Sequence, residues 1–169
     1  MIKRILGALT AVAISASILF AVPALADDSE VILNVKSPGY SEGIGTWLDS
    51  SLGDAGGGPT RYSNDAKTAE YHTQLSKGYY QVSIYKLFNA SSDPAAKIEI
   101  GHNGEIDTIT VNYTEGKSEW VILGAYNFDE GSDAFVRINR TGGAIRTGSV
   151  RFKRIDESEI VSYETKKAL

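Results

Sequence analysis

Two histidines, His72 and His102, and 21 acidic residues are the groups that could do chemistry in this chain. A zinc site needs three or four ligands at close spacing, and the two histidines lie on separate segments with no further ligands beside them. A pair of carboxylates could act on a glycosidic bond, because residues far apart in sequence can meet in space. Most acidic residues here, however, lie in turns or on exposed strand faces, which favours a solvated surface.

Several enzyme signatures are absent, among them GxSxG, HExxH, the Walker loop and CxxC. The glycine-rich run 53–58 lacks the lysine and the following helix of a phosphate-binding loop. Residues 49–54 and 129–133 carry oxygen ligands of the kind that calcium takes, but neither matches the EF-hand pattern. We expect no catalytic residue, no enzymatic activity and no cofactor, with structural calcium as the open alternative.

The elements that must position any site are strands. Short stretches of alternating apolar and polar residues follow one another from residue 30, separated by turn residues, and no helical period interrupts them. In the clearest stretch, Tyr80, Val82 and Ile84 point to one face and are expected in the core, while Tyr79 and Tyr85 point to the other. The pattern predicts an all-β fold, an antiparallel β-sandwich of the jelly-roll kind with about eight or nine strands. The candidate strands are 31–35, 68–75, 79–87, 97–100, 106–113, 119–126, 134–139 and 145–155.

The N-terminal segment has the three parts of a cleavable secretory signal peptide. Basic residues at 3–4 are followed by an apolar run over 5–22, and Ala24 and Ala26 are the small residues that a signal peptidase recognises. Cleavage after residue 26 predicts a secreted, extracellular protein. The apolar run is also long enough to span a bilayer, so an uncleaved anchor is the alternative.

The remainder has the size of one domain. We divide the chain into a signal peptide (1–26), a linker (27–29), a β-sandwich domain (30–156) and a charged C-terminal tail (157–169), which could form a frayed strand or one helical turn.

Composition limits the partners. The chain has no cysteine, so it can carry neither a lipoprotein anchor nor a disulfide, and a secreted domain without disulfides is more typical of a bacterium than of an animal. The net charge of −4 becomes more negative once the basic signal is removed. An acidic surface argues against nucleic acid and, after signal cleavage, against membranes.

A series of short motifs resembles one known family, the domain found at the C-terminus of golvesin and in xanthan lyases, described as carbohydrate-binding-module-like. The resemblance covers residues 30–155. The matching pieces, in order, are Gly45–Trp47, Arg61–Ser63, Thr68–Tyr71, Lys77–Tyr85, Ile100–Gly104, Glu119–Gly124 with Phe128 and Gly131, and Val150–Phe152. One departure is Gly148, which stands where the family often has an aspartate two residues before the closing valine.

The resemblance implies a β-sandwich of the galactose-binding-like kind and a non-catalytic role in binding a polysaccharide or a cell-surface glycan. A secreted structural or adhesion module that binds a protein partner is the alternative, because a carbohydrate-binding module usually accompanies a catalytic domain and we expect a single domain without one here. A small glycan-degrading enzyme is a third hypothesis.

Sugar recognition combines aromatic faces that stack on the ring with planar polar side chains that bind its hydroxyls. The candidate ligand-binding residues are Trp47, Arg61, Tyr62, Tyr71, His102, Asn103 and Trp120. Structural roles compete with these assignments. Trp120 lies within an apolar run, which favours the core, and Arg61 could instead pair with an acid that fixes the loop. The dipeptide Asn103-Gly104 predicts a tight hairpin turn between the neighbouring candidate strands, and His102 is expected to be exposed in that turn.

Overall fold

The computed structural model describes residues 29–156 and 158–160. The predicted signal peptide, most of the predicted linker and most of the predicted tail lie outside these residues. Within the described part of the tail, residues 158–160 form a helical turn.

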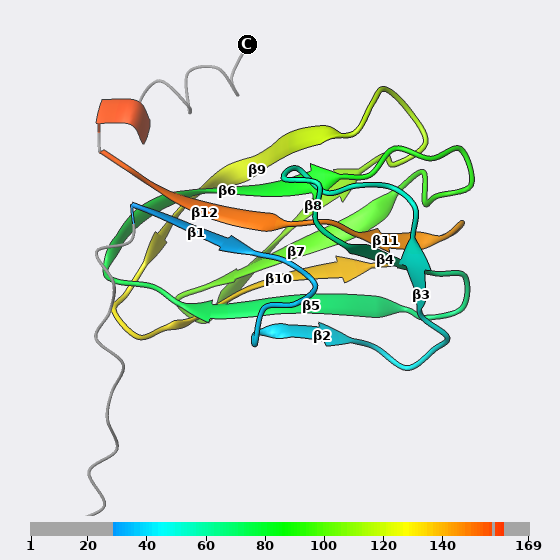
Figure 1. Cartoon of the computed structure of the whole chain (residues 1–169). Helices are drawn as coiled ribbons and strands as arrows, with labels where there is room; N and C mark the ends of the chain where they lie inside the picture. Colours follow the sequence, from blue (N-terminus) through cyan, green and yellow to red (C-terminus); the bar gives the residue numbers. More distant parts are fainter. Residues whose placement is uncertain (1–28, 157, 161–169) are drawn as a thin grey trace, which may run out of the picture.

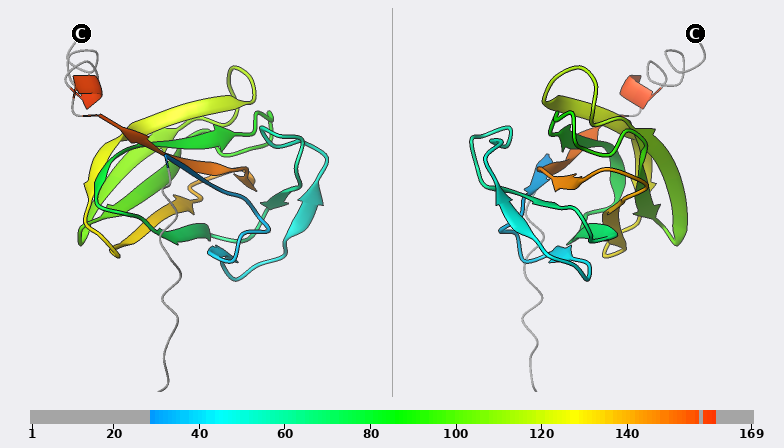
Figure 2. Two further views of the ribbon diagram at one scale, coloured as in Figure 1. Left: turned by 60° about the vertical axis from the view of Figure 1, so that its left-hand side comes forward. Right: turned by 90° about the vertical axis from the view of Figure 1, so that its right-hand side faces the viewer.

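Two antiparallel sheets face each other and a third, smaller sheet lies at one end of the pair (Figures 1 and 2). Sheet A has the strand order β1-β12-β6-β9, with β1 Glu30–Leu33, β12 Val150–Ile155, β6 Gly78–Lys86 and β9 Glu119–Phe128. Sheet B has the order β2-β5-β10-β7-β8, with β2 Tyr40–Glu42, β5 Thr68–Gln74, β10 Asp133–Asn139, β7 Ala96–His102 and β8 Glu105–Val111. Sheet C has the order β11-β4-β3, with β11 Ile145–Thr147, β4 Thr60–Ser63 and β3 Leu48–Ser50.

The predicted antiparallel β-sandwich is confirmed, although the described residues form twelve strands rather than eight or nine. The additional strands are short. β2 and β3 have three residues each, too few for an alternating pattern to be recognised. The expected strand 145–155 is divided at Gly148 and Ser149 into β11, in sheet C, and β12, in sheet A.

The core lies between sheets A and B. Tyr80, Val82 and Ile84 of β6 are fully buried, as expected, against the buried isoleucines and valines of β7 and β10. Aromatic rings also pack in this core, and the ring centroids of Phe128 and Phe152 are 5.9 Å apart. Since the chain has no disulfide, this packing provides most of the free energy that opposes unfolding.

A bulge in β9 determines which of its residues reach the surface. The register between β6 and β9 shifts after Val82, so that Gly124 pairs with Val82 and Ile122 with Ser83, leaving Leu123 as the additional residue. A bulge reverses the alternation of side chains beyond it. Trp120 therefore lies on the outer face of sheet A and Tyr126 on the inner face, although an even number of positions separates them.

Candidate functional site

The seven predicted ligand-binding residues do not form one site. Trp47, Arg61 and Tyr62 lie at the end of the sandwich that carries sheet C, whereas His102 and Asn103 lie at the opposite end, in the turn between β7 and β8 (Figure 1). Trp120 lies on the outer face of sheet A, and Tyr71 is in the core.

The prediction of Tyr71 as a ligand contact is wrong. Its side chain is fully buried, its ring packs on Tyr40, and its hydroxyl donates a hydrogen bond to the Gly148 carbonyl. Burial raises the pKa of the phenol well above its usual value. Because β5 pairs with strands on both sides, alternate residues of it face the core, and the position of Tyr71 in the family motif reflects packing.

Trp47 and Arg61 also have partners within the protein. The Trp47 indole Nε1 donates to the Gly43 carbonyl at 2.9 Å, and the ring packs against the core. Arg61 forms a 2.7 Å bond from Nε to Glu42 and another 2.7 Å bond from Nη1 to Asp49. The alternative of an internal ion pair therefore describes Arg61.

Trp120 lies outside the core, although the apolar run around it predicted a core position. The guanidinium of Arg151 lies 4.4 Å from the centroid of its ring, and Tyr85 meets it edge to face at 5.5 Å. Tyr85 lies on this outer face, as its alternation with Tyr80 and Ile84 predicted. The ring of Trp120 is partly exposed but already carries a cation on one of its faces.

Gly148, the departure from the family pattern, lies where no side chain fits. A Cβ atom there would come within 2.5 Å of the Tyr85 carbonyl oxygen and 3.3 Å of an Asp54 carboxylate oxygen. Asp54 belongs to the glycine-rich loop and accepts hydrogen bonds from the amide and the hydroxyl of Ser149. The carboxylate of Asp54 therefore lies beside Gly148, the position at which the family often has an aspartate.

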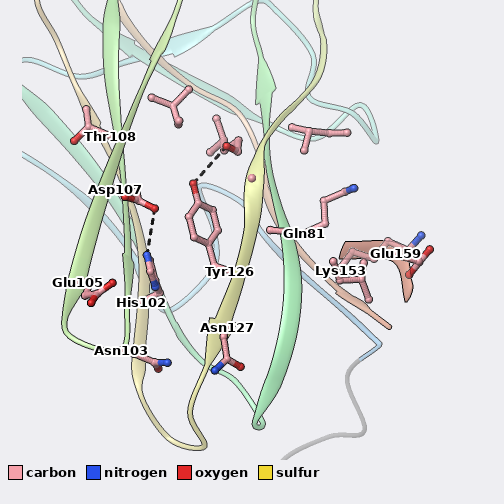
Figure 3. Close-up of a pocket in the computed structure, with 16 residues that line it drawn as sticks. Gln81, His102, Asn103, Glu105, Asp107, Thr108, Tyr126, Asn127, Lys153 and Glu159 are labelled. Atoms are coloured by element: carbon pink, nitrogen blue, oxygen red, sulfur yellow. Dashed lines mark hydrogen bonds and ion pairs between the residues drawn. The ribbon is translucent and has the colours of Figure 1, made fainter. Parts of the chain in front are cut away.

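A groove beside β9 has a volume of about 1150 Å³. β8 and β9 are the outermost strands of their sheets on this side. Figure 3 shows the lining on both sides of β9, with Glu105, Asp107 and His102 on one side and Gln81 and Lys153 on the other. The rest of the lining is partly apolar and includes Ile109, Ile122, Leu123, Ala125 and Ile155.

His102 forms part of the groove wall. Its ring lies 4.8 Å from the ring of Tyr126, and its Nε2 is 3.4 Å from Asp107 Oδ2. Only 14% of the His102 side chain is exposed. The prediction that His102 is exposed in the turn is therefore wrong, because its ring packs against the protein. The following Asn103 has a φ of 48°, and its side-chain oxygen accepts a 2.7 Å bond from the Asp129 amide. The tight Asn103-Gly104 turn confirms the predicted hairpin.

Two amide side chains line the groove and have no hydrogen-bond partner in the part of the chain that the structure describes. Gln81 and Asn127 make no side-chain hydrogen bond to any other residue that the structure describes, and both are partly exposed. Asn127 faces outward because the bulge at Leu123 reverses the alternation of β9. Each planar amide offers two N–H donors and one acceptor oxygen to a ligand.

Sequence reasoning missed Gln81, Asn127, Asp107 and Lys153 as groove residues. The alternation of β6 did place Gln81 on the outward face. No sequence signal, however, showed that β8 and β9 would be neighbouring sheet edges, and this arrangement is what gathers these four residues.

No three acidic or histidine side chains come together as metal ligands within residues 29–156 and 158–160. In the two segments considered for calcium, Asp49 pairs with Arg61, Asp54 with Ser149 and Asp133 with His72. The described residues also include no helix long and apolar enough to cross a membrane.

Several solved structures have a similar fold. A Paenibacillus xanthan lyase matches with a TM-score of 0.69 and 22% identity over 76% of this chain, but over only 13% of the lyase. The CBM35 module of Abf62 from Cellvibrio japonicus matches with a TM-score of 0.53 and 17% identity, over 73% of this chain and 91% of the module. The module CBM6cm-2 of Cellvibrio mixtus lichenase 5A was solved with cellotriose. It matches with a TM-score of 0.51 and 18% identity, over 75% of this chain and 98% of the module. The protein has the β-sandwich fold of carbohydrate-binding modules.

The chain belongs to the golvesin C-terminal domain family, whose model matches residues 31–154. This confirms the family indicated by the sequence motifs. None of the curated protein sequences is significantly similar to this one.

Proposed function

We propose that this protein is a secreted, non-catalytic module that binds a polysaccharide or a cell-surface glycan through the groove beside β9. The observation that carries the proposal is the pair of amides, Gln81 and Asn127, which face the groove and have no partner among the described residues. Unused hydrogen-bonding groups at the surface of a preformed groove are available to a ligand.

The groove has the mixed chemistry that a sugar requires. Gln81 and Asn127 can donate to and accept from neighbouring hydroxyls, and Lys153 and Asp107 add charged groups along the walls. Ile122, which is about half exposed, offers an apolar surface to the C–H groups of a sugar ring. The fold supports the same conclusion, because modules of this architecture are carbohydrate-binding, and one was solved with cellotriose.

Binding is tested by affinity electrophoresis of the protein through gels that contain soluble neutral or acidic polysaccharides, with calorimetric titration of cellotriose as a defined probe. We expect retardation by at least one polysaccharide. The double variant Gln81→Ala with Asn127→Ala should weaken binding about tenfold or more, because two hydrogen bonds to the ligand are lost at about 1 kcal/mol each.

A matched control removes two exposed amides that do not line the groove, Gln74→Ala with Asn64→Ala. This control should bind as the wild type does. Equal weakening in both double variants, or no retardation of the wild type by any polysaccharide, would contradict the proposal.

The absence of catalysis is tested on the same polysaccharides by measuring newly formed reducing ends. Among the acidic residues that line the groove, Glu105 and Asp107 are the two to examine, since both lie on β8. We expect no release of reducing ends. Release that is abolished by Glu105→Gln or Asp107→Asn would instead identify a glycan-degrading enzyme.

Secretion is supported by the pattern of residues 1–26. In a bacterial host, the protein should accumulate outside the cytoplasm with Asp27 as its first residue, as determined by mass spectrometry. An intact N-terminus retained in the membrane fraction would favour the uncleaved anchor.

One observation favours a protein partner as the second candidate. On the outer face of sheet A, Ile32 and Ile122 are both about half exposed, and between them Ser83 Oγ and Arg151 Nε are buried without a hydrogen-bond partner among the described residues. Ile32→Lys would abolish such an interaction and leave polysaccharide binding unchanged.

A further inference from the structure

Arg146 is the most buried arginine of the described residues, with 8% of its surface exposed. It lies on β11, directly opposite Tyr62 of β4, and its guanidinium carbon is 4.9 Å from the centroid of the Tyr62 ring. Its Nε donates a 2.7 Å hydrogen bond to Ser92 Oγ. Among the described residues, no carboxylate forms an ion pair with it.

A buried charge without a counter-charge is unusual, because the loss of hydration costs several kcal/mol and pairing normally offsets it. Burial lowers the pKa of Arg146, opposed in part by Tyr62, but a guanidinium in a protein stays protonated at neutral pH. Asp93, the sequence neighbour of Ser92, does not compensate the charge. Its carboxylate accepts hydrogen bonds from the amides of Ala95, Thr141 and Gly142.

The guanidinium is held in one orientation. Ser92 fixes its Nε, and Tyr62 covers one face of its plane. Ser92 is itself fixed, because its loop is joined to the segment before β11 by the hydrogen bonds Ala144 N to Ser91 O at 2.9 Å and Asp93 N to Ala144 O at 3.1 Å. The two terminal Nη atoms have no partner among the described residues, and both reach solvent. Two parallel N–H donors at the edge of a fixed guanidinium match the two oxygens of a carboxylate.

We propose that Arg146 binds the carboxylate of an acidic sugar residue in a polysaccharide, at the end of the sandwich opposite the groove. This inference rests on the proposed function and adds a second contact of defined chemistry to it. Leu48, 46% exposed, lies in register with Tyr62 on the same face of sheet C and can pack on the apolar side of the sugar ring.

The test compares polygalacturonate with its carboxyl-reduced form in affinity electrophoresis, and glucuronate with glucose in nuclear magnetic resonance titrations. The wild type should be retarded by polygalacturonate more than by the reduced polymer and should bind glucuronate in preference to glucose. Arg146→Gln should lose about tenfold or more of the affinity for the acidic ligands, since hydrogen bonds between charged groups contribute about 1.5–3 kcal/mol.

Arg146→Lys keeps the charge but loses the paired donors, so it should recover only part of the affinity. Lys36→Gln removes the same charge at an exposed loop position and should bind as the wild type does. The comparison of the two polymers on the wild type needs no variant, so it stands even where a substitution at Arg146 impairs folding.

The outcomes separate the two proposals. Absence of binding to every polysaccharide contradicts the proposed function. Binding of neutral polysaccharides that depends on Gln81 and Asn127, with no preference for carboxylated ligands or no effect of Arg146→Gln, overturns this inference alone. Binding of polyglutamate, but not of polygalacturonate, through Arg146 would also overturn it and would point to an acidic protein partner.

Discussion

Arg61 and Arg146 lie on neighbouring strands of sheet C and face opposite sides of it, because Arg146 pairs with Tyr62, the residue that follows Arg61. Arg61 is the more exposed of the two, yet it has two carboxylate partners, Glu42 and Asp49. Arg146 is nearly buried and has none among the described residues. From desolvation alone we would expect the carboxylate partners at Arg146, because the more buried charge loses more hydration and pairing offsets that cost.

This difference between Arg61 and Arg146 distinguishes charged side chains that stabilise the fold through ion pairs from one that is available to a ligand. The outer face of sheet B follows the Arg61 pattern: Arg137 bonds to Glu70 through Nε and to Glu99 through Nη1, each at 2.7 Å. Such neighbouring charges neutralise each other and hold strands in register. The face of sheet C that carries Arg146, Tyr62 and Leu48 has a fixed cation and exposed apolar surface instead.

The largest expected effect is that of Tyr71→Ala, beneath the Arg61 side of sheet C. It removes a fully buried ring and the hydrogen bond to Gly148, so the free energy of unfolding should fall by about 3–5 kcal/mol in urea titrations. Tyr62→Ala, on the other side, is the control and should cost about 1 kcal/mol or less, because only the partly exposed ring and its cation contact are lost. Equal costs would remove the distinction between a packed side and an open side.

A smaller loss is expected for Arg61→Met, which leaves Glu42 without its cation. Glu42 is partly buried, whereas the Asp49 side chain is 90% exposed and contributes little. The free energy of unfolding should decrease by about 1–2 kcal/mol. Asp49→Asn is the matched control, and a cost as large as that of Arg61→Met would show that the exposed half of the network holds the strands.

The charged network on sheet B predicts a still smaller, pH-dependent effect. Burial opposes protonation of His72, but its contacts with Glu70, at 3.0 Å, and Asp133, at 3.1 Å, outweigh burial and raise its pKa above 6.5. The folded protein therefore binds this proton more tightly than the unfolded chain does. The resulting stability is complete below pH 6.5 and is lost as the pH rises through the folded pKa. The hydrogen bond from His72 lowers the pKa of Glu70 below 4.5, so its contribution is lost at acid pH.

Urea titrations at pH 5.5 and pH 8 test this effect. The wild type should lose a few tenths of a kcal/mol more than His72→Gln over this interval, a small amount because the imidazole is partly exposed and solvent screens its ion pairs. Identical pH dependence in the two proteins would show that the network does not respond to the histidine proton.

Local patterns were enough to predict the sandwich and its family. Alternation placed Tyr80, Val82 and Ile84 in the core, and the Asn103-Gly104 dipeptide marked a hairpin that the structure contains. The apolar run around Trp120 suggested the core, but Trp120 pairs with Tyr85 on the outer face of sheet A, and the additional residue Leu123 reverses the alternation further along β9. A bulge depends on how two strands pair, which neither strand's sequence states by itself.

The candidate sites were harder to predict because tertiary pairing creates them. Arg61 and Arg146 look alike in the sequence, and only the fold brings Glu42 and Asp49 to one of them and Ser92 to the other. The groove likewise needs the edges of two different sheets. Residue type therefore identified chemistry that could bind a sugar, whereas the distribution of partners decides which side chains are free to do so.

A substitution with opposing effects on stability completes the comparison. Arg146→Met loses the Ser92 hydrogen bond and the contact with Tyr62 but removes the desolvation cost of an uncompensated charge. These terms oppose each other, so the free energy of unfolding should stay within about 1 kcal/mol of the wild type, even though Arg146 is the more buried of the two arginines. If Arg146→Met costs as much as Arg61→Met in the same urea titrations, the guanidinium serves the fold. If it costs little while binding of glucuronate is lost, the cation on this face of sheet C is held in place for a ligand.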